Sequence, residues 1–315
     1  MKTEKFDFYN SSSLKSYNLN EKIRYQLKLL DGLDTFTRLH SENVATITCK
    51  LCENLHLDRG FTVYCITCAY IHDIGKIFIP PAILQKTSKL TEEEYEIMKT
   101  HTTIGYDMCM KDPKLRPYAA GTLYHHESLD GSGYPNGLVG KKIPYEAQII
   151  RIADEFEAIT AKRQYKTHIG IIETLQILIE HATPTMKNEK TGKIKLFSPE
   201  TMVGKIDKKI LKALFRMVID DTEYEISVRC EYLEFLKKDI KRLKEALTYY
   251  NKMQSASNPQ KKEYFRQGAQ YLLEGNEEVD KIPIMLEELK EAYKVRSAHI
   301  DKLYQEVKQI KKLRI

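Results

Sequence analysis

Two short segments carry the residues best suited to chemistry. Residues 124–135 place two adjacent histidines, His125 and His126, directly before a turn rich in glycine. About fifty residues upstream, residues 72–76 read His-Asp-Ile-Gly-Lys. Imidazole and carboxylate groups together are typical ligands of divalent metal ions, so the two segments indicate a metal-centred hydrolase.

Three further residues extend this set of potential ligands within one short region of the chain: His40, His101 and Asp154. With the two segments above, the set contains five histidines and two aspartates. Imidazole suits iron, manganese, zinc and nickel, and a carboxylate can bridge two ions. One ion would not need so many ligands, so the set predicts a pair of metals.

The order of these residues resembles the HD-GYP family, a branch of the HD-domain phosphohydrolases known as cyclic di-GMP phosphodiesterases in bacteria. The resemblance runs from about Leu33 to about Leu178. It rests on a whole series of motifs, because a His-Asp dipeptide alone occurs often by chance. The series includes residues 71–80, 90–94 and 137–144, which follow the family pattern almost residue by residue.

The resemblance implies a role for each residue of the series. It assigns one ion to His40, His72, Asp73 and Asp154, and the other ion to His101, His125, His126 and the bridging Asp73. The lysine that matches Lys76 contacts substrate phosphate in the family, and the residues that match Arg163 and Lys166 bind other parts of the phosphodiester ring. A lysine can offset negative charge that develops on phosphorus, and a guanidinium can donate two parallel hydrogen bonds to a phosphate. Asp73 and Lys76 are therefore the predicted catalytic residues.

Phosphodiester chemistry explains why two ions are useful. The anionic oxygens repel a nucleophile, and two cations both bind those oxygens and lower the pKa of a bridging water. The expected reaction is hydrolysis of cyclic di-GMP to linear pGpG by a metal-bridging hydroxide, with iron or manganese as the expected metals. Two alternatives stay open. The substrate could be another cyclic dinucleotide such as cyclic GMP-AMP, because no motif places the side chains that read the base, or the chain could be a catalytically silent cyclic di-GMP receptor.

The turn after the histidine pair predicts a shaped loop more than a chemical group. Gly131 and Gly133 permit positive φ, and Pro135 fixes its own φ. Tyr134 could also stack within the site or contact a partner protein. Adjacent residues on a helix diverge by about 100°, so the two neighbouring histidines share a metal only where their helix ends. The turn provides that end.

Three positions depart from the family pattern. Asn43 stands three residues after His40, where an arginine is common, and so removes a charged group near the first helix. Glu157 replaces the aspartate usually found three residues after the metal aspartate. Phe36 stands where some members carry a glutamate that belongs with a third metal. Because phenylalanine cannot ligate, a dinuclear site is predicted, with pGpG as the end product rather than GMP.

Two pairs of cysteines repeat the spacing of a structural zinc site: Cys49 with Cys52, and Cys65 with Cys68. Both pairs lie inside apolar helical patterns without glycine knuckles or turns. Cysteine behaves as a small buried apolar residue, and cytosolic thiols stay reduced. Core packing is therefore predicted in place of zinc.

Helical periodicity dominates the chain, and no alternating run is long enough for a sheet. The predicted fold is an all-α HD-domain bundle, with helices at about 21–31, 39–56, 61–74, 91–110, 115–126, 145–161, 168–181 and 205–218. The predicted organisation is a short lead-in over 1–30, a catalytic domain over 31–225 and a helical extension over 226–315. A polar insertion at about 182–197 predicts a surface loop, which is solvated or acts as a lid.

The extension alternates apolar residues at intervals of four and three, from Leu236 to Tyr250 and again from Leu286 to Ile310. Two long amphipathic helices, separated by a short helix at about 263–273, predict an antiparallel hairpin or a coiled-coil arm that forms a homodimer. The lysines of this region could instead form a nucleic-acid surface, which tight, salt-sensitive binding in a gel-shift titration would reveal. Nucleic acid is not the expected partner.

Length and composition limit the possible architecture, location and ligands of the protein. A chain of 315 residues with 42% hydrophobic and 30% charged residues fits one good core and a smaller appendage. It has no run of about eighteen apolar residues and no apolar segment at its start, so no membrane span and a cytoplasmic location are expected. The net charge of +6 favours an anionic ligand only weakly, because a lysine-rich solvated surface accounts for most of the excess.

Overall fold

The computed structural model describes residues 35–161, 169–184 and 203–315, and these residues form helices joined by turns. The only pairing of extended residues in these ranges is an isolated bridge between Asp130 and Val139. The predicted all-α fold class is therefore confirmed. The helices are α3 (Thr35–Asn54), α4 (Arg59–Ile71), η2 (Ile74–Phe78), α5 (Pro81–Leu84), α6 (Glu92–Lys99), α7 (His101–Lys111), η3 (Arg116–Tyr118), α8 (Ala119–Tyr124), η4 (Gly140–Lys142), α9 (Tyr145–Thr160), α10 (Ile171–Ala182), α11 (Lys208–Ser255), α12 (Pro259–Tyr271), η6 (Val279–Lys281) and α13 (Ile282–Ile310).

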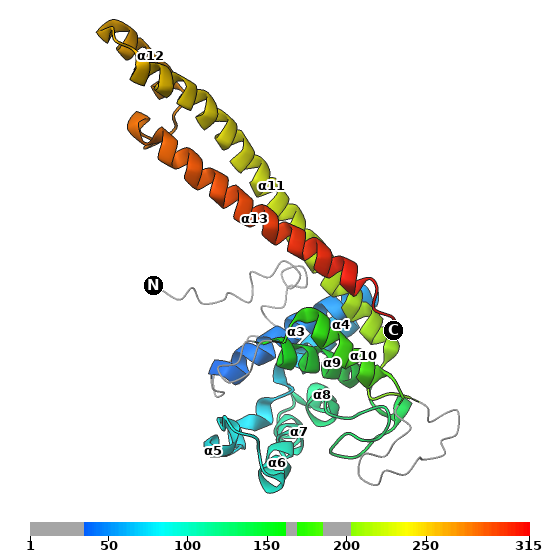
Figure 1. The fold of residues 1–315 in the computed structure, drawn as a ribbon. Coiled ribbons are helices and arrows are strands. Elements are labelled where there is room, and N and C mark those ends of the chain that lie inside the picture. Colours follow the sequence, from blue (N-terminus) through cyan, green and yellow to red (C-terminus); the bar gives the residue numbers. More distant parts are fainter. Residues whose placement is uncertain (1–34, 162–168, 185–202) are drawn as a thin grey trace. The chain divides into compact units, whose positions relative to one another are not determined.

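The chain forms two compact units. The first contains the residues up to Met217 together with 313–315, and the second contains Val218–Lys312. Helices α3 to α10, blue to green in Figure 1, belong to the first unit, and so do the predicted metal ligands. Among the described helices, none combines the length and the apolar character that crossing a bilayer requires.

Helices α3, α4 and α9 pack against one another and form the apolar core of the first unit. Val44 on α3, Ile66 on α4 and Ile150 on α9 have no exposed surface. These three helices also carry or adjoin several predicted ligands. Burial of their apolar faces therefore fixes the backbone from which those ligands project.

The four paired cysteines belong to the same core. Cys49, Cys52, Cys65 and Cys68 are buried and free. Burial raises the pKa of the Cys49 thiol, and a protonated thiol does not ligate metal. No cysteine of the described residues belongs to a group that could hold a metal ion. The prediction of core packing is confirmed.

Several helix boundaries differ from those predicted, each for a local reason. The helix predicted over 91–110 is two helices, α6 and α7, separated at Thr100. Thr91 and Glu94 form a capping box that begins α6, since the Thr91 hydroxyl accepts from Glu94 N and the Glu94 carboxylate accepts from Thr91 N. The helix predicted over 205–218 continues as α11 to Ser255, because no glycine or proline interrupts residues 205–258.

A close backbone contact holds η2 against α7. A Cβ placed on Gly75 would lie 2.0 Å from the carbonyl oxygen of His101 and 2.7 Å from Gly105 N. Only glycine permits this approach. The contact brings the segment that carries His72 and Asp73 directly beside the start of α7, where His101 lies.

Substitution of Gly75 tests this contact. We expect Gly75→Ala to lower the free energy of unfolding by about 2–3 kcal/mol or more, because the added methyl group meets backbone that cannot rotate away. Chemical denaturation of the metal-free protein measures the change. Gly170→Ala is the matched control, since a Cβ there meets no atom within 4 Å and the expected change is below about 1 kcal/mol. Equal stability of the two variants would contradict the packing role of Gly75.

The second unit contains an antiparallel pair of long helices. Apolar residues of α11 and α13, including Leu236, Ile300 and Val307, form one buried cluster. The Lys311 ammonium lies 2.6 Å from the Glu223 carboxylate, which places the end of α13 beside the early part of α11. Helix α12 joins them, and the Asn258 side chain caps its first turn. Of the two predicted arrangements, the structure has the hairpin, while dimerisation stays a prediction.

Candidate metal centre

Most of the predicted ligands stand where a helix begins or ends. His72 ends α4, Asp73 precedes η2, His101 begins α7, His125 ends α8 and His126 follows it. His40 and Asp154 project from within α3 and α9. The helix predicted over 61–74 thus stops at Ile71, and α8 stops at Tyr124. These ends change the direction of the chain, so that neighbouring side chains can face one point.

Asp73 lies at the centre of the ligand set. Its Oδ1 atom is 3.3 Å from His101 Nε2 and 3.9 Å from His125 Nε2. Its Oδ2 atom is 3.3 Å from His72 Nε2 and 3.6 Å from His40 Nε2. Each carboxylate oxygen therefore faces a different pair of imidazoles, which is the arrangement that a bridging carboxylate requires.

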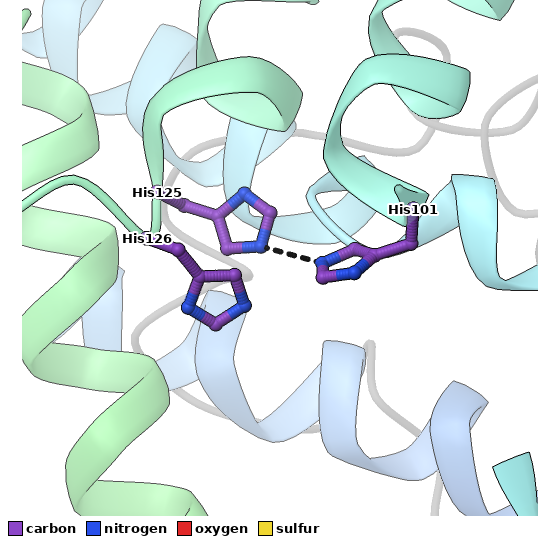
Figure 2. Close-up of side chains that lie close together, drawn as sticks. All are labelled: His101, His125 and His126. Carbon is purple, nitrogen blue, oxygen red and sulfur yellow. Dashed lines mark hydrogen bonds between the residues drawn. The ribbon is translucent and has the colours of Figure 1, made fainter. Parts of the chain in front are cut away.

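The ligands divide into two groups around this carboxylate. One group contains His101, His125 and His126, whose ligand atoms all lie within 4.8 Å of one another. Figure 2 shows these three imidazoles gathered together, with the Nε2 atoms of His101 and His125 3.2 Å apart. The other group contains His40, His72 and Asp73.

Asp154 reaches toward both groups. Its Oδ1 atom is 3.0 Å from His40 Nε2, and its Oδ2 atom is 3.9 Å from His126 Nδ1. The structure therefore brings all seven predicted ligands together. The contact with His40 is the shorter one, which agrees with the assignment of Asp154 to the ion of His40.

Among the predicted ligands, two buried atoms lack any hydrogen-bond partner, and a cation would satisfy both. They are His72 Nε2 and Asp73 Oδ1. Three rings are oriented by their other nitrogen, since the Nδ1 atoms of His72, His101 and His125 lie 2.6, 2.7 and 2.9 Å from backbone carbonyl oxygens. Donation from Nδ1 leaves the Nε2 lone pair directed at the centre. An unpaired buried polar atom is costly, so this donor set fits divalent metal ions.

The electrostatics favour the forms that bind metals. Burial lowers the pKa of His101 to about 4 and also lowers the pKa of His125, so both imidazoles are neutral near pH 7. Burial acts to raise the pKa of Asp73, but His72 and Lys76 outweigh it and hold the pKa well below its ordinary value. Neutral imidazole and ionised carboxylate are the ligating species.

His40 differs from the other imidazoles. Burial lowers its pKa, but hydrogen bonds to Asp154 and Glu157 outweigh burial and raise the pKa to about 9. The metal-free protein therefore holds a proton on this ring near neutral pH. Metal binding at His40 must release that proton.

Two departures from the family pattern meet in the structure. Glu157 Oε2 lies 2.5 Å from His40 Nδ1, and Asn43 Nδ2 donates to Glu157 Oε1 over 3.0 Å. Glu157 is buried, and both of its oxygens are occupied. The pair therefore fixes the ring of His40 through the nitrogen that faces away from Asp73 and Asp154.

We expect Glu157→Gln to weaken metal binding about 10–100-fold, because a carboxylate that holds a ligating histidine both orients the ring and increases its basicity. Asn43→Ala removes only the hydrogen bond that a neutral amide donates to Glu157, and it should weaken metal binding only a few-fold. Competition with a fluorescent chelator measures both affinities. Glu53→Gln, which alters an exposed carboxylate on α3, is the control. An unchanged affinity in Glu157→Gln would mean that His40 needs no such partner.

The predicted loop residues are arranged around a residue that sequence reasoning did not single out. Gly131 has a φ of 80°. A Cβ on Gly133 would lie 2.3 Å from Ser128 N, so the turn folds tightly onto the end of α8. The buried Glu127 carboxylate accepts from the backbone nitrogens of Asn136 and Leu138, over 2.7 and 2.8 Å. Glu127 thus holds the two sides of the loop together.

The tyrosine of this loop contacts the site directly. The ring of Tyr134, which precedes Pro135, stacks on the imidazole of His126, with centroids 4.7 Å apart and an interplanar angle of 27°. Tyr134 was expected to stack within the site or to contact a partner protein, and the structure shows stacking within the site. The stacked ring covers one side of His126 and thereby restricts its orientation.

The ligand groups open onto a cavity of about 520 Å³. Lys76 lines it, with its ammonium 2.5 Å from Asp73 Oδ2. The prediction that Lys76 reaches the site does not need a helix that continues through Gly75, because Lys76 lies in η2. Arg151 and Lys205 also line the cavity, and sequence reasoning missed both. The predicted substrate residues Arg163 and Lys166, and most of the insertion at 182–197, lie outside the described residues.

Comparison with known proteins places this site in a family. The model of the HD domain family matches residues 20–186, which is more than half of the chain. The chain belongs to the HD-GYP branch of the HD-domain family. The resemblance noted in the motifs is therefore confirmed, and the candidate metal centre lies entirely within the matched residues.

Three relatives illustrate where this HD-GYP chain is similar to known proteins. A cyclic di-GMP phosphodiesterase of Thermotoga maritima is 36% identical over 195 residues, covering 61% of this chain and 50% of that protein. The cyclic di-GMP phosphodiesterase response regulator RpfG of Xanthomonas campestris is 40% identical over 44% of this chain and 37% of its own length. The 3'3'-cGAMP-specific phosphodiesterase 3 of Vibrio cholerae is 34% identical over 49% of this chain and 34% of its own length. The chain thus spans half or less of these relatives.

Proposed function

We propose that this HD-GYP domain hydrolyses cyclic di-GMP to linear pGpG at a dinuclear metal centre. The observation that carries the proposal is the position of Asp73 between two groups of imidazoles. Three of those imidazoles, on His40, His101 and His126, line a cavity of about 520 Å³. A cavity of this size falls in the range of small-ligand sites. The names of the relatives support the class of substrate.

The division of the ligands supports two ions. One ion would be held by His40, His72, Asp73 and Asp154, and the other by His101, His125, His126 and Asp73. Iron and manganese suit this mixture of imidazole and carboxylate. When bound, two such ions supply Lewis acidity toward the phosphate oxygens and lower the pKa of water.

The chain's own residues supply the rest of the chemistry. Asp73 and Asp154 provide the negative charge that holds the ions, and Glu157 fixes His40. Lys76 places a positive charge at the cavity wall, where it offsets charge that develops on the phosphate. Tyr134 and Met98 line the same cavity and exclude water from part of it.

Phe36 stands where some HD-GYP proteins carry a glutamate that belongs with a third metal, and this difference supports pGpG as the product. Phe36 is 46% exposed and offers no ligand atom. Among the described residues, the groups of three or more side chains that could hold a metal ion are the two already named. A two-ion site with no third ligand set is expected to stop after the first hydrolysis. Metal analysis that finds three fully occupied ions, or GMP as the main product, would contradict this step.

A hydrolysis assay tests the proposal. Purified protein loaded with iron, manganese or zinc is given cyclic di-GMP, 3'3'-cyclic GMP-AMP or cyclic di-AMP, and the products are separated by chromatography. We expect cyclic di-GMP to be cleaved fastest and pGpG to accumulate. Preference for cyclic GMP-AMP would favour the second candidate, which the name of the Vibrio cholerae relative supports. Binding without hydrolysis at several pH values would indicate a receptor.

A further inference from the structure

Among the described residues, three lysine and arginine side chains line the cavity, and two of them already contact protein groups. The Lys76 ammonium lies 2.5 Å from Asp73 Oδ2. Arg151 donates to the carbonyl oxygen of His126 over 3.3 Å and lies 4.0 Å from the Glu155 carboxylate. The third is Lys205, and no carboxylate within the described ranges lies at ion-pair distance from its ammonium. Its positive charge is therefore available to a ligand.

The backbone of Lys205 is fixed on both sides. Its N–H donates to the carbonyl oxygen of His181 over 2.6 Å, and its carbonyl oxygen accepts from Leu129 N over 2.9 Å. The preceding Gly204 packs so closely that a Cβ there would lie 2.4 Å from the backbone of Ala182. These contacts anchor Lys205 to the end of α10 and to the loop that follows the metal-ligating histidines. The half-buried side chain thus starts from a rigid point on the cavity wall.

A cyclic dinucleotide carries a second anionic group that the Lys205 ammonium could bind. The ring contains two phosphodiester groups, and only one of them can lie at the metal centre during a single hydrolysis. The second phosphate carries a full negative charge, which is costly to hold in a cavity without a cation. A lysine ammonium is a suitable partner for phosphate oxygens.

We infer that Lys205 binds the phosphate that is not being cleaved. The inference rests on the proposed function and extends it to the recognition of the substrate as a ring with two phosphates. Lys205 lies beyond the residues 20–186 that the HD-domain model matches.

Kinetics with two substrates distinguish phosphate binding by Lys205 from a general structural role of this residue. Bis(p-nitrophenyl) phosphate has one phosphodiester and no second phosphate. We expect Lys205→Gln to raise KM for cyclic di-GMP about tenfold or more relative to KM for bis(p-nitrophenyl) phosphate, because a charged hydrogen bond is lost only with the larger substrate. The kcat for cyclic di-GMP should change much less than KM. Lys205→Arg keeps the positive charge, so its KM for cyclic di-GMP should lie close to the wild-type value.

Lys209→Gln is the matched control, since Lys209 is exposed and does not line the cavity. It should leave both substrates unaffected. Equal losses with the two substrates in Lys205→Gln would indicate a structural role and overturn the inference, and so would an unchanged KM for cyclic di-GMP. If the wild-type protein cleaves bis(p-nitrophenyl) phosphate but no cyclic dinucleotide, the proposed function itself fails. Wild-type activity therefore distinguishes the two failures.

Discussion

Asp73→Ala is expected to lower kcat/KM for cyclic di-GMP by at least about a thousandfold, which is the scale associated with losing a main source of charge stabilisation at a metal-assisted site. Its two oxygens face different pairs of imidazoles at distances of 3.3–3.9 Å. In the proposed dinuclear centre, removal of the carboxylate would take a ligand from both ions at once. Metal content should fall from two ions to at most one per chain.

The comparison of Asp73→Asn with Asp73→Ala separates charge from shape. Asparagine keeps the size of the side chain but cannot supply a full negative charge, so we expect it to lose nearly as much activity as alanine. Inductively coupled plasma analysis gives the metal content, and steady-state kinetics gives kcat/KM. Asp107→Ala, which changes an exposed carboxylate on α7, is the control. Two bound ions and near-normal kinetics in Asp73→Ala would show that Asp73 does not bridge the ions.

The convergence of the metal ligands could be predicted from the sequence because their order and spacing form a long series. His40 and Asp154 are far apart in the chain, yet they lie 3.0 Å apart in the structure. The helix boundaries that position the other predicted ligands were harder to predict. Helix α4 stops at Ile71, and Gly75 then packs against the backbone of α7, a contact that periodicity does not contain.

The contact between Asn43 and Glu157 was not predicted because each residue was interpreted separately. Each appears in the sequence as the loss of a family feature, and 114 residues separate them. In the structure they form one hydrogen-bonded unit that holds His40. Lys205 was missed for a different reason. It lies outside the motif region, and only the packing of Gly204 and the bonds to His181 and Leu129 bring it to the cavity.

Lys76 is the residue whose loss should most affect kcat without loss of the metals. Its ammonium lies at the cavity wall and 2.5 Å from Asp73 Oδ2, so it is close to any phosphate that reaches the metal centre. Charge that develops on phosphorus in the transition state interacts with this cation more strongly than the charge of the ground state does. We expect Lys76→Met to lower kcat about 100–1,000-fold, with a smaller change in KM.

The metal content of Lys76→Met decides between two roles for this lysine. Lys76 also helps to hold the pKa of Asp73 low, so its removal could act through the carboxylate instead of the substrate. Retention of both ions together with a low kcat would support direct action on the phosphate, and Lys76→Arg should then recover part of the rate. Lys99→Met is the matched control, because Lys99 lies over the rings of Tyr95 and Tyr134 and pairs with Glu96 rather than with Asp73. Loss of metal in Lys76→Met would instead mean that the lysine acts by keeping Asp73 ionised. Methionine would leave the buried carboxylate without the ammonium group that stabilises its negative charge.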